Sequence, residues 1–110
     1  EHRVLLIFTP STEDSAYEKL LSELEKKQSA FAERDLRTYH LKTGGKGRVG
    51  NRAITEKEVE RLRKTYAVLE DSFTFILLDE RGIPILRAEA ALPARRLIEE
   101  IDEATAPGPP

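Results

Sequence analysis

Residues 4–21 read VLLIFTPSTEDSAYEKLL, and this stretch decides the fold. Its first part belongs to a nearly unbroken apolar run over residues 3–9, which is typical of a strand buried on both faces beside parallel neighbours. Pro10 cannot continue the ladder of such a strand. Three favourable helix caps follow: Ser11, Thr12 and Asp14. The stretch therefore predicts a central strand, a polar corner and a helix.

The rest of the chain predicts alternating helices and strands. Apolar residues at helical spacing, including Tyr17 and Phe31, indicate one helix over residues 14–31. A second helix begins at the capping box of Thr55 and Glu58, and a third at Pro93. Further strands are predicted over residues 35–41, 73–78 and 83–88. The glycine-rich residues 42–51 (KTGGKGRVGN) are expected to form a loop between them.

The resulting order, β-α-β-α-β-β-α, predicts an α/β thioredoxin-like fold. Right-handed crossovers make the first two strands parallel neighbours. The strand at residues 73–78 then lies antiparallel to the first, and residues 83–88, which contain Pro84, form an edge. We expect a four-stranded mixed sheet flanked by helices over residues 3–103. The Pro/Gly-rich residues 104–110 are expected to be a disordered tail.

The composition excludes several kinds of function. The 110 residues suggest one domain, and 39% hydrophobic with 35% charged residues is typical of a globular chain. The net charge of -2 gives no reason to expect nucleic acid as a partner, and no apolar run approaches the ~20 residues of a membrane span. The chain has no cysteine, which excludes disulfides, thiolate metal sites and cysteine nucleophiles. With only two histidines, no metal site or cofactor is expected.

The polar corner resembles the active-site corner of thioredoxins and, more loosely, the Pro-x-x-x-Thr-x-x-Cys pattern of peroxiredoxins. Thr12 and Ser15 stand where the two thioredoxin cysteines would be. The start of a helix offers free N–H groups and partial positive charge, which stabilise an anion there. The segment 73–83 also resembles peroxiredoxins, with an apolar strand, Asp, turn, Gly and second strand. Phe73 takes the place of their substrate-polarising arginine, and no Pro precedes this strand.

One family combines these features. On residues 3–11, on Tyr17 after an acidic pair and on residues 73–87, the chain resembles a peroxiredoxin-like domain of unknown function. That domain is shared by short bacterial proteins and by the vertebrate secreted proteins Equarin and the sushi-repeat proteins. The resemblance covers about residues 3–102. It implies a domain that has mostly lost the cysteine pair, with links to the extracellular matrix and adhesion, and so a secreted or periplasmic location.

The start of the chain is compatible with such a location. It begins at Glu1 and contains no methionine, which favours a processed or trimmed protein. A secretory signal could precede Glu1.

Two groups of residues are candidate sites. The first is the degenerate corner: Thr9, Pro10, Ser11, Thr12, Asp14, Ser15 and Tyr17. Its polar side chains are interpreted as helix caps, with an anion-binding corner and non-thiol catalysis as alternatives. The second group is the candidate anion-binding set in the glycine-rich segment: Lys42, Lys46, Arg48 and Arg52. It is either a solvated loop or a contact for an acidic protein, a heparin-like sulfate or nucleic acid.

These observations favour a non-catalytic protein-binding or scaffolding module with an unidentified protein partner. The edge of residues 83–88 offers a second binding route, because an exposed strand can accept a partner strand. An enzyme with non-thiol chemistry at the corner and a polyanion-binding protein are the alternatives. Neither reduction of disulfides nor turnover of peroxide is expected, since both reactions depend on thiols.

Overall fold

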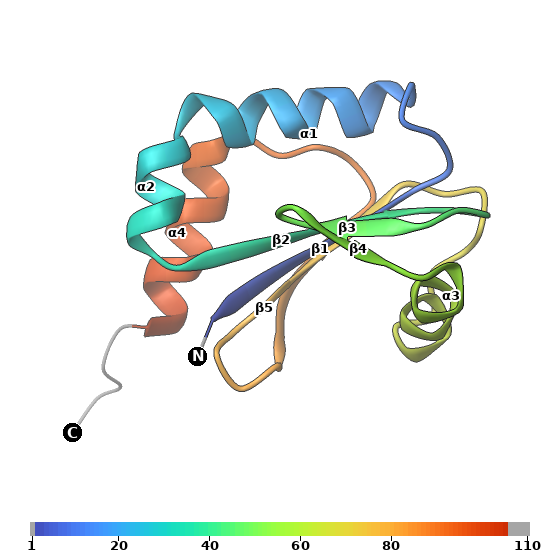
Figure 1. Cartoon of the computed structure of the whole chain (residues 1–110). Coiled ribbons are helices and arrows are strands. Elements are labelled where there is room, and N and C mark those ends of the chain that lie inside the picture. Colours follow the sequence, from blue (N-terminus) through green and yellow to red (C-terminus); the bar gives the residue numbers. More distant parts are fainter. Residues whose placement is uncertain (1, 106–110) are drawn as a thin grey trace.

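A mixed β-sheet runs through the part of the chain that this computed structural model describes, residues 2–105. The elements follow in the order β1 (Arg3–Thr9), α1 (Ser15–Lys26), α2 (Gln28–Glu33), β2 (Leu36–Lys42), β3 (Gly47–Val49), β4 (Arg52–Ile54), α3 (Glu56–Thr65), β5 (Thr74–Leu78), β6 (Pro84–Ala88) and α4 (Ala94–Thr105). Figure 1 shows α1 on one face of the sheet and α3 on the opposite face.

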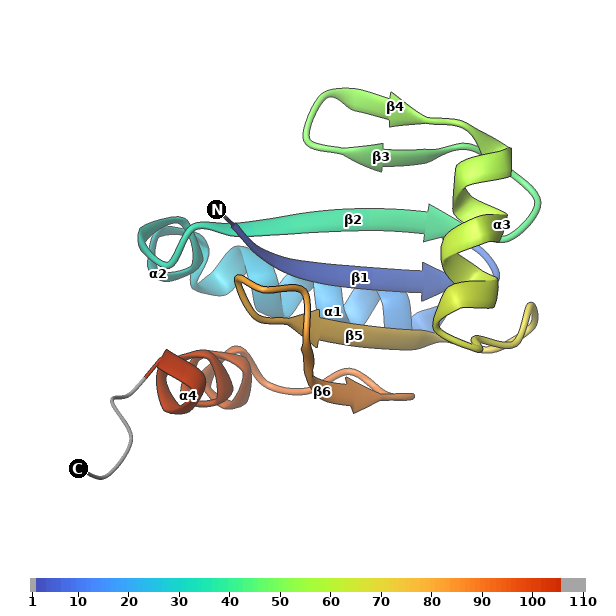
Figure 2. The ribbon, with the colours of Figure 1, turned by 90° about the horizontal axis from the view of Figure 1, so that it is seen from below.

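The strand order is β4-β3-β2-β1-β5-β6. β1 pairs in parallel with β2 and antiparallel with β5, and β6 lies outside β5. This arrangement confirms the predicted topology of these strands. The predicted number of strands is wrong, because the sheet has six strands within the described residues instead of four. The additional pair, β3 and β4, extends the sheet beyond β2 (Figure 2).

The additional hairpin takes up residues 47–51, half of the expected loop at residues 42–51. β3 pairs antiparallel with β2, joining Tyr39 to Val49 and His40 to Arg48. The burial pattern of β3 alternates, with Gly47 and Val49 buried and Arg48 exposed. Such alternation is typical of a strand with one buried face. The short period-two pattern was present in the sequence, but the glycines around it favoured a loop.

The two faces of β1 supply two separate cores. Leu5 and Ile7 pack on the face covered by α1, α2 and α4, whereas Leu6 and Phe8 pack on the face covered by α3. The first core also contains Tyr17, Leu20, Phe31, Phe73, Phe75, Leu77, Ala94, Leu97 and Ile101. The second also contains Leu41, Val49, Ile54, Val59, Val68, Ile76 and Leu78. The hairpin is thus fixed to the core on the α3 side through Val49 and Ile54.

The predicted single helix at residues 14–31 is two helices. The chain leaves helical geometry at Lys27 (φ −124°, ψ 37°), and α2 turns sharply away from α1 (Figure 1). Phe31 on α2 nevertheless returns to the same core as Tyr17 and Leu20. The apolar spacing continues across the break, and no Pro or Gly marks it, so local sequence patterns do not predict the bend.

The C-terminal helix is longer than expected. Ala104 and Thr105 belong to the predicted tail, but they are the last residues of α4. Residues 106–110, the remainder of the predicted disordered tail, lie outside the described residues.

Gly47 provides a test of how the hairpin meets the core. A Cβ atom at Gly47 would lie 2.9 Å from the carbonyl oxygen of His40 and 3.0 Å from Val59 Cγ2. We expect Gly47→Ala to lower the free energy of unfolding by about 1–3 kcal/mol, because overpacking forces the hairpin away from β2. Urea denaturation followed by circular dichroism measures this change.

Gly45→Ala is the matched control. Its Cβ would approach only Lys42 Nζ, at 3.8 Å, and Gly45 does not have a positive φ. Its effect should stay within about 0.5 kcal/mol. Equal stability of the two variants would contradict the packing described for β3.

Candidate functional site

In the corner between β1 and α1, polar side chains form hydrogen bonds with nearby backbone groups. Thr9 Oγ1 donates to the Ser11 carbonyl oxygen (2.6 Å), and Ser11 Oγ accepts from the backbone N–H of Glu13 (3.0 Å). Asp14 Oδ1 accepts from the N–H groups of Ala16 (3.0 Å) and Tyr17 (3.2 Å). The Asp14 carboxylate therefore caps α1 and takes up N–H groups that an external anion would need.

A cavity of about 180 Å³ lies beside this corner. Its lining, here called the cationic cleft, consists of Thr9, Thr12, Tyr17, His40, Leu41, Lys42, Lys46, Gly47 and Arg48. The cleft joins members of both sequence-predicted groups: Thr9, Thr12 and Tyr17 from the corner, and Lys42, Lys46 and Arg48 from the basic segment. The remaining predicted residues do not line it: Pro10, Ser11, Asp14, Ser15 and Arg52.

The topology of the sheet brings these residues together. Because β1 and β2 are parallel, their carboxyl ends meet at the same edge, with Thr9 opposite Lys42. The chain is held there by Thr43, whose N–H donates to the Thr9 carbonyl oxygen (3.0 Å) and whose Oγ1 donates to that of Glu70 (2.6 Å). β3 then returns along β2 and places Arg48 opposite His40.

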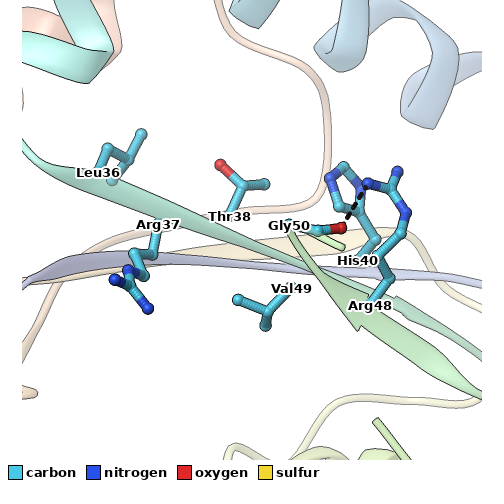
Figure 3. Close-up of a pocket in the computed structure, with 7 residues that line it drawn as sticks. All are labelled: Leu36, Arg37, Thr38, His40, Arg48, Val49 and Gly50. Atoms are coloured by element: carbon cyan, nitrogen blue, oxygen red, sulfur yellow. Dashed lines mark hydrogen bonds between the residues drawn. The ribbon is translucent and has the colours of Figure 1, made fainter. Parts of the chain in front are cut away.

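His40 is the site residue that sequence reasoning missed. Its Nδ1 lies 2.9 Å from the hydroxyl oxygen of Tyr17, and the two rings meet edge to face with centroids 6.0 Å apart. Figure 3 shows His40 and Arg48 projecting side by side from their neighbouring strands. The signal that could have found His40 was its place near the end of the strand parallel to β1.

Burial and the nearby charge of Arg48 lower the pKa of His40 to about 4. His40 is therefore neutral at neutral pH. Burial also raises the pKa of the Tyr17 hydroxyl, an effect that the charge of Arg48 partly opposes. An imidazole with so low a pKa is a poor general base near pH 7, since catalytic efficiency is highest when the pKa is close to the working pH.

The charges of the cleft have one sign. Lys42, Lys46 and Arg48 line it, and within the described part of the chain no Asp or Glu side chain does. Nor do residues 2–105 contain a group of three or more His, Asp or Glu side chains placed to hold a metal ion. Among the helices of these residues, none combines the length and apolar character needed to cross a membrane. The chemistry that the cleft supports is electrostatic binding of an anion.

Removal of the Asp14 carboxylate tests its capping role. We expect Asp14→Ala to lower the free energy of unfolding by about 1 kcal/mol, because two N–H groups of α1 lose their acceptor. Thermal or urea denaturation measures the loss. The control is Glu13→Ala, which removes an exposed carboxylate and should change stability by less than about 0.5 kcal/mol. A smaller loss for Asp14→Ala than for Glu13→Ala would contradict the assignment.

The lowered pKa of His40 predicts a pH dependence of stability. The unfolded chain binds a proton at His40 near its ordinary pKa of 6.5, whereas the folded chain does so only at about 4. The stability linked to His40 is therefore complete above pH 6.5 and is lost as the pH falls from 6.5 to 4. His40→Gln should lose less stability than the parent between pH 7.5 and about 4.5 in urea denaturation. Equal losses, or an NMR titration of His40 near 6.5, would contradict this prediction.

Comparisons with solved structures show the same fold. A reduced 2-Cys peroxiredoxin from Plasmodium vivax aligns with a TM-score of 0.64 and 21% identity, covering 94% of this chain and 77% of the other. Thioredoxin peroxidase I from Plasmodium yoelii gives a TM-score of 0.67 and 19% identity, covering 94% and 73%. A thioredoxin-fold protein from Helicobacter pylori gives 0.58 and 17%, covering 94% and 68%. At these identities the likeness shows the fold alone, which is thioredoxin-like.

The family of the chain follows from its sequence. No curated protein matches the chain. The family described as "Domain of unknown function (DUF4174)" matches residues 1–106, which is nearly the whole length. The chain therefore belongs to the DUF4174 family, as a cysteine-free member with a thioredoxin-like and peroxiredoxin-like fold.

Proposed function

We propose that this domain is a non-catalytic binding module that recognises an anionic group of a partner protein in the cationic cleft. The observation that carries the proposal is the lining of this cavity of about 180 Å³. Lys42, Lys46 and Arg48 border it, and no carboxylate does among the residues described. Its volume is suited to a single compact group, such as a carboxylate, phosphate or sulfate, and less suited to a bulky ligand.

The corner gives little support to catalysis. A serine or threonine hydroxyl needs a nearby base to become a nucleophile. Thr12 and Ser15 are exposed, and the hydrogen-bond partner of the His40 ring is Tyr17. With a pKa of about 4, His40 is also a weak base at neutral pH. Asp14 instead caps α1, and Ser11 Oγ accepts from the N–H of Glu13 just before the helix.

Polyanion binding is the second candidate function. It is favoured by the concentration of cationic residues on and around the β3–β4 hairpin. Arg52, however, lies on β4 outside the cleft, so the four predicted cations do not line one cavity. The geometry therefore favours recognition of one group on a protein surface. The resemblance to Equarin and the sushi-repeat proteins supports a secreted or periplasmic setting for such a partner.

Inorganic phosphate is a suitable probe of the cleft. In a titration at constant ionic strength, the backbone amide signals of Thr12, Gly47 and Arg48 should shift with saturation in ¹⁵N NMR spectra. The pKa of His40 should rise from about 4, because a bound anion offsets the charge of Arg48. The double variant Lys46→Ala/Arg48→Ala should bind phosphate at least about tenfold more weakly, since charge-assisted hydrogen bonds are lost.

The matched control is Lys57→Ala, which removes an exposed cation on α3 and should leave the phosphate response unchanged. A response that never saturates would refute recognition in the cleft. So would equal affinities of the double variant and the control. If longer sulfated chains bound more tightly than phosphate, and if this binding depended on Arg52, the polyanion function would be supported instead.

A further inference from the structure

The outer edge of β2 is only partly covered by the hairpin. β2 contains seven residues, all of which pair with β1. On the other side, β3 pairs with β2 at Tyr39 and His40 and does not extend to residues 36–38. Figure 2 shows this first part of β2 continuing past the turn between β3 and β4. In the described chain, residues 36–38 thus have no strand on their outer side.

A cavity of about 340 Å³ lies at this uncovered edge. Its lining, here called the β2 notch, is formed by Leu36, Arg37, Thr38, His40, Arg48, Val49 and Gly50. Figure 3 shows Leu36, Thr38, His40 and Arg48 on one face of the sheet, and Arg37 and Val49 on the other. Each face beside the open edge therefore presents an arginine, and the face of Arg48 also presents the partly exposed side chain of Leu36, whereas Val49 on the other face is buried. As in the cationic cleft, no Asp or Glu of residues 2–105 lines the notch.

We propose that the β2 notch accepts a short acidic segment of a partner protein as an added strand, paired with residues 36–38. The inference rests on the proposed function and extends it from one anionic group to an extended segment. Main-chain hydrogen bonds along an open strand edge supply affinity, and side chains on the two faces supply selectivity. Carboxylates at alternate positions of the added strand would lie on the face of Arg37, and the apolar side chains between them would lie on the face of Leu36 and Thr38.

The charges favour an acidic partner over a second copy of this chain. Two copies that paired through this edge would bring their Arg37 and Arg48 side chains together, and like charges across paired strands are destabilising. The opposite edge of the sheet is less suited to strand addition. β6 contains Pro84, which lacks a backbone donor, and its pairing with β5 is irregular near Leu78.

The notch and the cationic cleft share His40 and Arg48, but each has a residue of its own. Arg37 lines only the notch, and Lys46 lines only the cleft. A substitution at Arg37 therefore tests the strand-binding inference without disturbing the phosphate response of the cleft.

The first experiment measures binding of a defined peptide by fluorescence anisotropy. The probe is a fluorescein-labelled pentapeptide of alternating glutamate and valine with blocked ends. Saturable binding is expected, and Arg37→Glu should weaken it at least about tenfold while leaving phosphate binding intact. The control is Arg95→Glu, which makes the same charge change at an exposed position on α4 and should bind the peptide like the parent.

The second experiment separates strand pairing from charge attraction. Two versions of the peptide carry N-methyl groups on the glutamates or on the valines, which removes alternate N–H donors without changing the charge. In a strand, alternate N–H groups point to opposite edges, so one version should lose about tenfold in affinity and the other should bind normally.

Three results would overturn the inference: no saturable binding of the unmodified peptide, equal effects of Arg37→Glu and Arg95→Glu, or equal binding of the two N-methylated peptides. If phosphate still bound through Lys46 in any of these cases, the proposed function would stand and only the strand-binding inference would fall.

Discussion

The burial of β1 on both of its faces is the constraint on which the rest of the structure depends. Leu5, Ile7 and Phe8 are inaccessible to solvent; Leu5 and Ile7 belong to one core and Phe8 to the other. A strand with two apolar faces must lie inside a sheet and must have helices on both sides. β2 and β5 therefore flank it, α1 and α4 cover one face, and α3 covers the other. The same constraint brings the carboxyl end of β1 beside that of β2, where the polar corner and the cationic residues meet.

This domain shares its scaffold with peroxiredoxins but arranges its charges differently. In thiol enzymes of this fold the start of the first helix stabilises a thiolate, whereas here Asp14 already occupies the first N–H groups of α1. The positive charge of the cleft comes from Lys42, Lys46 and Arg48, which lie at the end of β2 and on the hairpin that follows. Arg48 also helps to keep His40 neutral. The positive charge therefore comes from the end of β2, the turn after it and β3, and not from the start of α1.

Local patterns were sufficient to predict much of the fold. The apolar run of β1 and the caps of α1 and α3 depend on neighbouring residues, and Thr55 Oγ1 indeed accepts from the N–H of Glu58 (3.2 Å). Features that depend on distant contacts were missed. Arg63 carries a charge that favours the surface, yet it is buried with its guanidinium 5.5 Å from the centre of the Phe8 ring and bonded to the Leu69 carbonyl oxygen. The pairing of His40 with Tyr17 likewise exists only after the crossover between β1 and β2 has formed.

The β3–β4 hairpin joins the core mainly through Gly47, Val49 and Ile54, while Gly50, Asn51, Arg52 and Ala53 are exposed. Surface turns of this kind tolerate changes of sequence and length at little thermodynamic cost. Substitutions in this turn could therefore change the lining of the β2 notch, to which Gly50 belongs, without disturbing the folding of the central sheet. Related domains could in this way acquire different preferences on an unchanged frame.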